Sequence, residues 1–199
     1  MKIIPSLLST FLLVVVLAGF APTERQAASW SVDKVHSNVG FKVKHLGISN
    51  VRGDFEDYEA TLNFDPEDLG TLETNVTVQI ASIDTENDRR DNHLRSADFF
   101  DAENHPTMTF VSKEVRNIDG NEFEIVGDLT IRGTTKEVVL DAAFLGTAVM
   151  GDKERSAFEA STTINRMDYG LAWNNLTEAG GFVVGHDVDI IIELEAIKN

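Results

Sequence analysis

Apolar and polar side chains alternate in one segment of this chain after another, and this period of two constrains its fold more than any other feature. The clearest example is an alternating run over residues 39–44, followed by the turn residues Gly47 and Asn50 and a second run over residues 51–55. Successive side chains of a β-strand point to opposite faces, so such a run forms a strand with one buried face. The pattern predicts a β-hairpin with one apolar and one charged face.

Comparable segments follow along the rest of the chain, with turn residues between them. They cover residues 58–64, 76–80, 108–110, 123–131, 138–144, 158–164 and 188–196. Only Asp84 to Phe100 is predicted to be helical, because charged residues run along most of it and apolar residues end it. About eight antiparallel strands with one helical insertion predict an all-β barrel or sandwich. The long, regular last segment favours a closed barrel, because closure removes the exposed strand edge.

An apolar run at residues 7–20 follows Lys2 and ends in small residues. It is too short to span a bilayer comfortably, since a spanning helix needs about 20 apolar residues. We predict a cleaved signal peptide over residues 1–28, followed by one domain over residues 29–199 that is periplasmic or secreted and has no stable membrane insertion. A retained N-terminal anchor is the alternative. The sequence contains no Cys, which excludes a disulfide framework.

Acidic side chains dominate the charge of the predicted domain. The whole sequence has a net charge of −16, and removal of Lys2, Glu24 and Arg25 with residues 1–28 leaves 15 basic and 32 acidic side chains, or −17. This charge argues against a nucleic-acid partner, whose phosphates require a basic surface, and it disfavours an anionic membrane surface. An acidic surface favours a soluble monomer, and a homodimer is also compatible with the sequence.

The predicted barrel has an apolar interior. Eight strands enclose a space that side chains can just fill or that can hold one small ligand. An apolar lumen suits an aliphatic chain, because each buried CH₂ group contributes about 0.8 kcal/mol. The predicted lumen and ligand contacts are Phe41, Val43, Leu46, Phe99, Phe100 and Phe110. The alternative is that the phenylalanines, 12 in all, fill the barrel themselves.

Basic side chains near this apolar face are candidates for contact with a polar head group. His45 continues the inward-facing series of its strand and is predicted at one mouth of the barrel. Lys44, Arg52 and Arg95 are cations that would suit a phosphate or carboxylate at that mouth. Alternatively, each cation pairs with a surface acid, an interaction worth about 0–1 kcal/mol.

Motifs of catalysis and metal binding are scarce. The sequence has no nucleophile elbow, glycine-rich nucleotide loop, phosphate loop or zinc-protease helix. The acidic run from Asp84 resembles a calcium loop, but Arg89 stands where such a loop needs glycine and Arg95 where it needs the bidentate acid. No metal site, cofactor or catalytic residue is predicted. Residues 166–170 are interpreted as a structural turn.

Several motifs, in one order, resemble those of the YceI-like family of exported lipid- and polyisoprenoid-binding proteins. They are Trp30-Ser31-Val32-Asp33, Val43-Lys44-His45-Leu46-Gly47, Val51-Arg52-Gly53, Asp98-Phe99-Phe100-Asp101, His105-Pro106-Thr107, Gly127-Asp128-Leu129-Thr130-Ile131-Arg132-Gly133 and Asp168-Tyr169-Gly170-Leu171. The resemblance spans Trp30 to about Ala196. It implies a lipocalin-like antiparallel barrel that holds a long isoprenoid, polyprenyl or quinone-like lipid in its lumen, with no catalytic residue to carry over.

Pattern and resemblance together lead to one hypothesis and two alternatives. The hypothesis is an exported carrier or storage protein for a long isoprenoid-type lipid, without enzymatic activity. The first alternative is an enzyme that modifies such a lipid with His45 as acid or base. The second is a stress-related interaction protein whose barrel is filled. A second polar group converging on His45 would favour the enzyme, and a barrel without a tunnel would favour the filled form.

Overall fold

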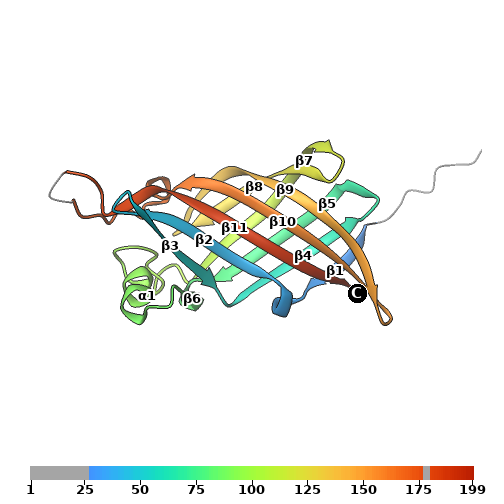
Figure 1. The fold of residues 1–199 in the computed structure, drawn as a ribbon, viewed down its shortest axis with the longest axis horizontal. Coiled ribbons are helices and arrows are strands. Elements are labelled where there is room, and N and C mark those ends of the chain that lie inside the picture. The colour runs from blue at the N-terminus through green and yellow to red at the C-terminus, as the bar shows by residue number, and fades with distance from the viewer. Residues whose placement is uncertain (1–26, 177–179) are drawn as a thin grey trace, which may run out of the picture.

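In the computed structural model, which describes residues 27–176 and 180–199, the strands form one antiparallel sheet that closes on itself (Figure 1). The strands are β1 (Ala28–Val32), β2 (Asn38–His45), β3 (Ser49–Phe55), β4 (Tyr58–Asp65), β5 (Asp68–Gln79), β6 (Ile83–Asp84), β7 (Thr107–Asp119), β8 (Glu122–Ile131), β9 (Thr134–Met150), β10 (Lys153–Asn165) and β11 (Val184–Lys198). The same residues include one short helix, α1 (Asp88–Arg95), and the 3₁₀ turns η1 (Lys34–His36), η2 (Ile80–Ser82) and η3 (Arg166–Tyr169). The predicted all-β fold with one helical insertion is confirmed.

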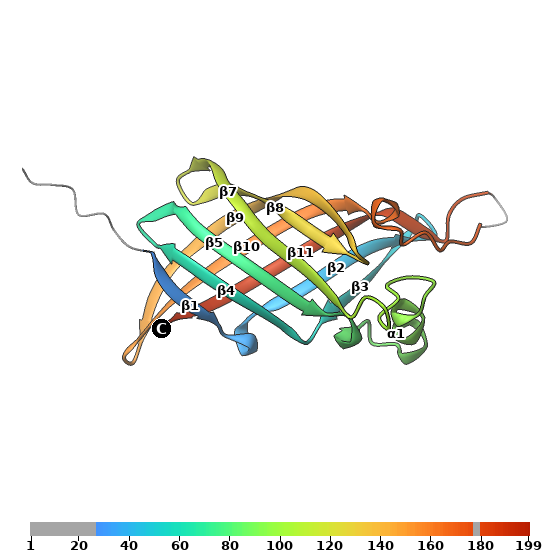
Figure 2. The ribbon, with the colours of Figure 1, turned by 180° about the vertical axis from the view of Figure 1, so that it is seen from behind.

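The strands occupy eight positions around the barrel, because three positions are each shared by two strands in succession. β11 pairs along one edge with β10 and along the other with β2 and then β1, whose Trp30 lies opposite Lys198. In the same way β3 and β4 follow one another, as do β5 and β6. Figure 2 shows the wall formed by β4, β5 and β7. Pairing of β1 with β11 closes the sheet, so the predicted closed barrel is confirmed.

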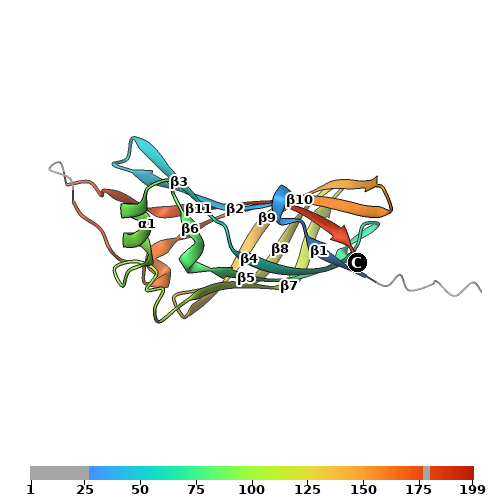
Figure 3. The ribbon, with the colours of Figure 1, turned by 90° about the horizontal axis from the view of Figure 1, so that it is seen from below.

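The two ends of the barrel differ. At the end where β1 and the C-terminus lie, Trp30 stacks on Phe64 with ring centroids 4.7 Å apart. The ring of Phe158 lies 5.0 Å from that of Phe64 and 5.1 Å from that of Phe144. At the other end lie α1 and the β2–β3 hairpin (Figure 3). Large aromatic side chains therefore close the first end, and an opening of the interior is expected at the second.

The helix is shorter than the predicted segment 84–100, which is a correction. α1 covers only Asp88–Arg95. Asp84 belongs instead to β6, where it pairs with Asp54 of β3. The side chain of Asn87 accepts a hydrogen bond from a backbone amide of the first turn and so begins the helix. A strand pairing with a distant segment thus replaces the first residues of the expected helix.

The predicted signal peptide lies outside the described residues except at its end. β1 begins at Ala28, which pairs with Phe64, so the sheet starts close to the predicted start of the domain. No helix in the described part of the chain is long and apolar enough to cross a membrane. Cleavage of residues 1–28 and the location of the protein stay predictions.

Two glycines let aromatic side chains lie across neighbouring strands. A Cβ atom on Gly53 would come within 2.7 Å of the Phe41 ring, and one on Gly127 within 2.4 Å of the Phe110 ring. Both distances are shorter than a van der Waals contact, so a larger residue at either position would require a shift in a close-packed wall. These glycines therefore help to position two rings that line the barrel interior.

A charged cluster braces the seam between β1 and β11. The Arg155 guanidinium on β10 donates to Asp33 Oδ2 at 2.7 Å and also to the carboxylate of Glu195 on β11. Asp33 directly follows β1, and its side chain also accepts the Val35 amide at 3.0 Å. Hydrogen bonds from Arg155 and then His36 lower the pKa of Asp33 to about 2. Asp33, His36 and Glu195 have metal-ligand atoms close together, but Arg155 already supplies the positive charge that the two carboxylates face.

The pKa of Asp33 predicts that the seam is sensitive to acid. Because folding lowers this pKa from 3.8 to about 2, the ionised carboxylate stabilises the folded state above about pH 5. That stabilisation is lost as the pH falls through about 2. Asp33→Asn should lower the melting temperature near neutral pH, and its difference from wild type should shrink between about pH 4 and 2. Thermal melts over this pH range measure the difference.

Asp57→Asn is the matched control, since it removes the carboxylate of an exposed pair with Lys34 at 3.4 Å. Such a pair contributes little, so the melting temperature should change little at any pH. A difference between Asp33→Asn and wild type that stays constant with pH would contradict the assigned role of the Asp33 carboxylate.

Candidate functional site

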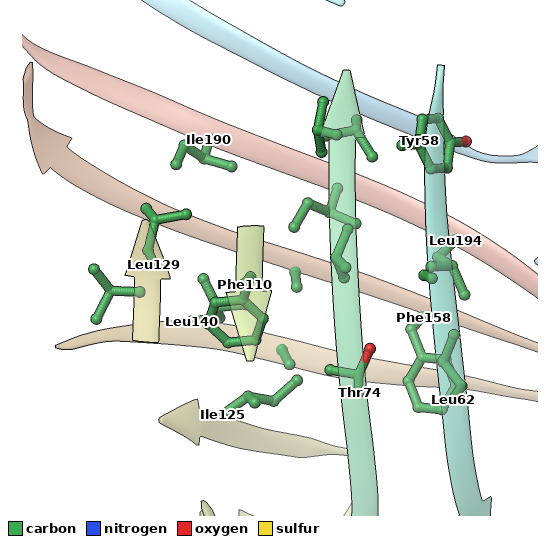
Figure 4. Close-up of a pocket in the computed structure, with 18 of the residues that line it drawn as sticks. Tyr58, Leu62, Thr74, Phe110, Ile125, Leu129, Leu140, Phe158, Ile190 and Leu194 are labelled. Carbon is green, nitrogen blue, oxygen red and sulfur yellow. The ribbon is translucent and has the colours of Figure 1, made fainter. Parts of the chain in front are cut away.

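Space remains inside the barrel, and apolar side chains line almost all of it. One interior cavity, here called the inner chamber, has a volume of about 110 Å³. Leu62, Phe110, Leu140 and Phe158 line it from four different strands (Figure 4). Phe158 also belongs to the aromatic cluster that closes the barrel, so the chamber ends at that cluster. These phenylalanines therefore line the barrel without filling it.

Small side chains on the inner face help to keep this chamber open. Ala60, Ala142 and Ala160 line it from β4, β9 and β10, and Ala142 and Ala160 are direct cross-strand neighbours. A larger residue at any of the three would occupy space that is now free. Sequence reasoning did not assign these alanines to the site. The available signal was alanine at inward positions of strands whose other inward residues are large.

A second cavity, the outer chamber, adjoins the inner chamber on the side of α1. Its volume is about 100 Å³. Four residues predicted from the sequence line it: Phe41, Val43, Phe99 and Phe100. Val39, Met108 and Ile190 line both chambers, which therefore lie end to end. The apolar interior thus extends from the aromatic cluster to the α1 end of the barrel.

A third hollow, here called the mouth groove, lies beside the outer chamber. The two share five apolar residues: Phe41, Val43, Leu94, Phe99 and Val184. The rest of the groove is mostly polar and includes Lys44, His45, Asn87, Arg89, Arg90 and His93. Trp173 packs against two of these residues, with its ring 4.8 Å from His93 and 5.2 Å from Phe99. The walls therefore change from almost wholly apolar in the chambers to a mixture of apolar and basic side chains in the groove.

Six of the predicted site residues line these cavities. Phe110 faces the inner chamber, and His45 lies in the mouth groove. The remaining four are the phenylalanines and the valine of the outer chamber named above. The structure therefore brings the predicted apolar contacts and His45 together along one path, from the aromatic cluster to the groove.

Leu46, Arg52 and Arg95 line none of these three cavities among the described residues. Leu46 lies in the turn between β2 and β3, and Arg52 is exposed on the outside of that hairpin. The guanidinium of Arg95 donates to the carbonyl of Ile83 at 2.7 Å and so ties α1 to β6. Of the predicted cations, only Lys44 joins His45 in the groove.

The environment of Arg166 was not apparent from the sequence. The predicted turn is present as η3, but the Arg166 side chain is only 4% exposed and lines the outer chamber. Its guanidinium donates to the carbonyls of Gly185 at 2.8 Å, Trp173 at 2.9 Å, Val184 at 3.3 Å and Leu171. No described acid pairs with it, and burial lowers its pKa. Arg166 thus holds both ends of the β10–β11 loop against the barrel.

Known proteins resemble this chain in sequence and in fold. Residues 30–196 match the model of the YceI-like domain. A UPF0312 protein of Staphylococcus epidermidis is 44% identical over 161 residues, which are 80% of this chain and 91% of that protein. The Campylobacter jejuni YCEI protein superposes with a TM-score of 0.69 at 43% identity, covering 84% of this chain and 96% of that one. A polyisoprenoid binding domain from Saccharophagus degradans shares the fold, with a TM-score of 0.62, 14% identity and coverage of 86% and 99%.

Loss of the buried guanidinium should loosen the β10–β11 loop. A lysine ammonium carries its donors on one nitrogen and cannot reproduce the planar fork that meets four carbonyls. Arg166→Lys and Arg166→Met should each lower the free energy of unfolding by about 2–4 kcal/mol, because buried carbonyls lose their donors. Urea unfolding measures this change, and hydrogen exchange of residues 171–185 reports on the loop.

Arg116→Lys is the control for this prediction. Arg116 donates to Glu124 at 2.8 Å in an exposed pair, so its replacement should cost less than about 1 kcal/mol. The role of Arg166 is refuted if both arginines cost the same or if exchange of residues 171–185 is unchanged.

Proposed function

The chain belongs to the YceI-like domain family, and from this premise we propose that it carries or stores one long-chain isoprenoid-type lipid, such as a polyprenyl or quinone-like compound, inside its barrel. One observation carries the proposal. Two apolar chambers lie end to end, are closed at one end by aromatic rings, and adjoin a cationic groove at the other. The proposed place of action is outside the cytoplasm, as the predicted signal peptide implies.

The chambers favour an aliphatic ligand on energetic grounds. Their walls offer extensive apolar contact and few groups that could satisfy a polar ligand, whose burial without hydrogen bonds is costly. A dozen buried CH₂ groups would contribute on the order of 10 kcal/mol before the costs of ordering the chain and the complex are subtracted.

The polarity of the walls also sets the orientation of the lipid. The apolar tail would enter first, because both chambers are apolar, and it would extend as far as the aromatic cluster at the end of the inner chamber. The polar end would stay in the mouth groove, where Lys44, His45 and Arg89 face it. A cationic groove suits a phosphate or another anionic head group through charge-assisted hydrogen bonds.

Two further considerations support a binding protein over the alternatives. The fold-level likeness to a polyisoprenoid binding domain is in keeping with a lipid in the lumen. An enzyme would need a polar group that activates His45, whereas no hydrogen bond to the imidazole of His45 occurs among the described residues. A filled barrel is disfavoured by the free volume of the chambers.

Filling the inner chamber should shorten the lipid that the protein can hold. Ala160→Phe adds a ring at the chamber wall, so the protein should lose long-chain lipids or retain only shorter ones. Ser161→Phe places the same ring on the exposed side of β10 and should leave the bound lipid unchanged. Native mass spectrometry followed by solvent extraction identifies the lipid in each protein.

This experiment also tests the proposal as a whole. Wild-type protein that neither retains a lipid on purification nor binds an added polyprenol would overturn it. Equal loading of long chains in Ala160→Phe and wild type would show that the lipid does not occupy the inner chamber.

Loss of the His45 imidazole should weaken binding of a charged head group selectively. A hydrogen bond to a charged group is worth about 1.5–3 kcal/mol, so His45→Ala should weaken binding of a phosphorylated polyprenol by roughly ten- to a hundredfold. Binding of the uncharged polyprenol should change much less. Lys153→Ala removes an exposed cation at the start of β10 and is the control. If both lipids weaken equally, or neither does, His45 is not a head-group contact.

A further inference from the structure

Exposed apolar side chains gather at the end of the barrel that carries the mouth groove. Ile48 is 86% exposed, Leu176 69%, Phe182 49% and Leu46 43%. They come from two segments that touch, since the Leu46 amide donates to the carbonyl next to Phe182 at 2.9 Å and Leu176 pairs with Phe182 as a β-bridge. These four residues are here called the mouth tip. Its two segments project together at one end of the molecule (Figure 1).

The turn within the mouth tip is one that seldom contains leucine. Leu46 and Gly47 both have positive φ values, 53° and 73°, and the Ile48 amide donates back to the His45 carbonyl at 3.2 Å. A β-turn with positive φ at both central residues favours Asn, Asp or Gly at the first of them, because other side chains are strained in the left-handed region. The turn conformation therefore disfavours leucine at position 46, whose side chain is also 43% exposed.

The hairpin that carries this turn is basic, in contrast to the chain as a whole. Residues 39–53 contain Lys42, Lys44 and Arg52 and no acidic residue. Lys42 pairs with Asp189 at 2.8 Å, but Lys44 and Arg52 have no ion pair in the described part of the chain. Arg89, in the first turn of α1, is likewise without an ion pair among these residues. The mouth end thus presents unpaired cations beside an apolar tip.

The net charge of the domain does not cancel this local charge. Acidic turns such as residues 65–68 and 119–122 join strands at the opposite end of the barrel. β11 has 15 residues, which correspond to about 50 Å of extended strand. Exposed charges farther apart than the Debye length, about 8 Å at physiological ionic strength, are largely screened. A surface in contact with the mouth tip therefore interacts mainly with the charges at this end of the barrel, among them Lys44, Arg52 and Arg89. Acids at this end, namely Asp88 in the first turn of α1, Asp98 beside His93 and Asp187 near the start of β11, reduce the attraction of these cations.

We propose that the mouth tip docks on the surface of a lipid bilayer that contains anionic lipids. The four apolar side chains would enter the boundary between head groups and acyl chains, while Lys44, Arg52 and Arg89 face the lipid phosphates. Apolar insertion and electrostatic attraction are the two signals that peripheral membrane binding combines. The net charge of the whole chain disfavours an anionic membrane surface, but residues 39–53 of the hairpin at this end carry only basic charges. The inference rests on the proposed function in that docking would point the mouth groove at the source of the lipid.

Vesicle flotation of the purified protein tests this docking, with its N-terminus determined by mass spectrometry. Wild type should bind vesicles made of equal amounts of phosphatidylcholine and phosphatidylglycerol, and binding should weaken in high salt. Ile48→Asp combined with Phe182→Asp should reduce the bound fraction by about tenfold or more. Val149→Asp is the matched control, because Val149 is 73% exposed in the β9–β10 hairpin at the opposite end. Arg52→Ser should weaken binding to the mixed vesicles and not to phosphatidylcholine alone.

Each other result overturns the docking proposal. These results are a wild type that does not float, an Ile48→Asp/Phe182→Asp protein that binds like wild type, and a Val149→Asp protein that loses as much binding. Docking is also overturned if the Ile48→Asp/Phe182→Asp protein changes its oligomeric state but binds vesicles like wild type. That result would assign the mouth tip to contact with a second copy of the chain. Native mass spectrometry of the same samples separates docking from the proposed function. Protein that retains lipid but does not float overturns docking alone, and protein that floats without binding any lipid overturns the carrier function alone.

Discussion

Pairing between β1 and β11 closes the sheet, and the interior of this protein exists only because of that closure. The seam is short, since β1 has five residues, and it is braced by side chains as well as by its backbone hydrogen bonds. Arg155 joins the carboxylate that follows β1 to one on β11, and the Trp30 ring packs inside the same end. Opening of this seam would expose two strand edges and release the aromatic cluster that ends the inner chamber. Stability of the seam and containment of a ligand therefore depend on the same few contacts.

The two chambers leave part of the barrel interior unfilled, which reduces the packing of the core. A close-packed core would stabilise the fold most, because each unfilled space forfeits contacts between its walls. Here three alanines on the inner face leave room between large neighbours, and the glycines beside Phe41 and Phe110 let those rings lie against the wall. The proposed aliphatic ligand would restore these lost contacts by occupying the space. Binding of such a lipid is accordingly expected to stabilise the folded protein as well as to load it.

Charge and polarity are arranged along the barrel axis. Apolar side chains occupy the aromatic end and both chambers, and the mouth groove then introduces Lys44, His45 and Arg89. Outside the groove the mouth tip is apolar again and is accompanied by unpaired cations. Apolar surroundings followed by a polar groove, in this order along the axis, match a lipid that has an apolar tail and a polar head group. Arg166 contributes to this arrangement indirectly, because it holds the loop that forms one side of the mouth.

The sequence by itself determined most of the strands, although not β1 or β6, together with the barrel class and part of the apolar lining, because the alternation of side chains is a local property that each strand displays alone. The same alternation places Arg52 on the outer face of its strand, beside inward Val51, and the prediction of Arg52 as a head-group contact did not take this into account. Only the tertiary structure decided how much space is left inside, since Ala60, Ala142 and Ala160 meet from strands far apart in sequence. It also shortened the helix, by pairing Asp84 with Asp54, and it surrounded Arg166 with carbonyls from a later loop. Free volume, helix limits and clustered charge depend on contacts between distant segments, and a one-dimensional pattern of residues does not specify those distances.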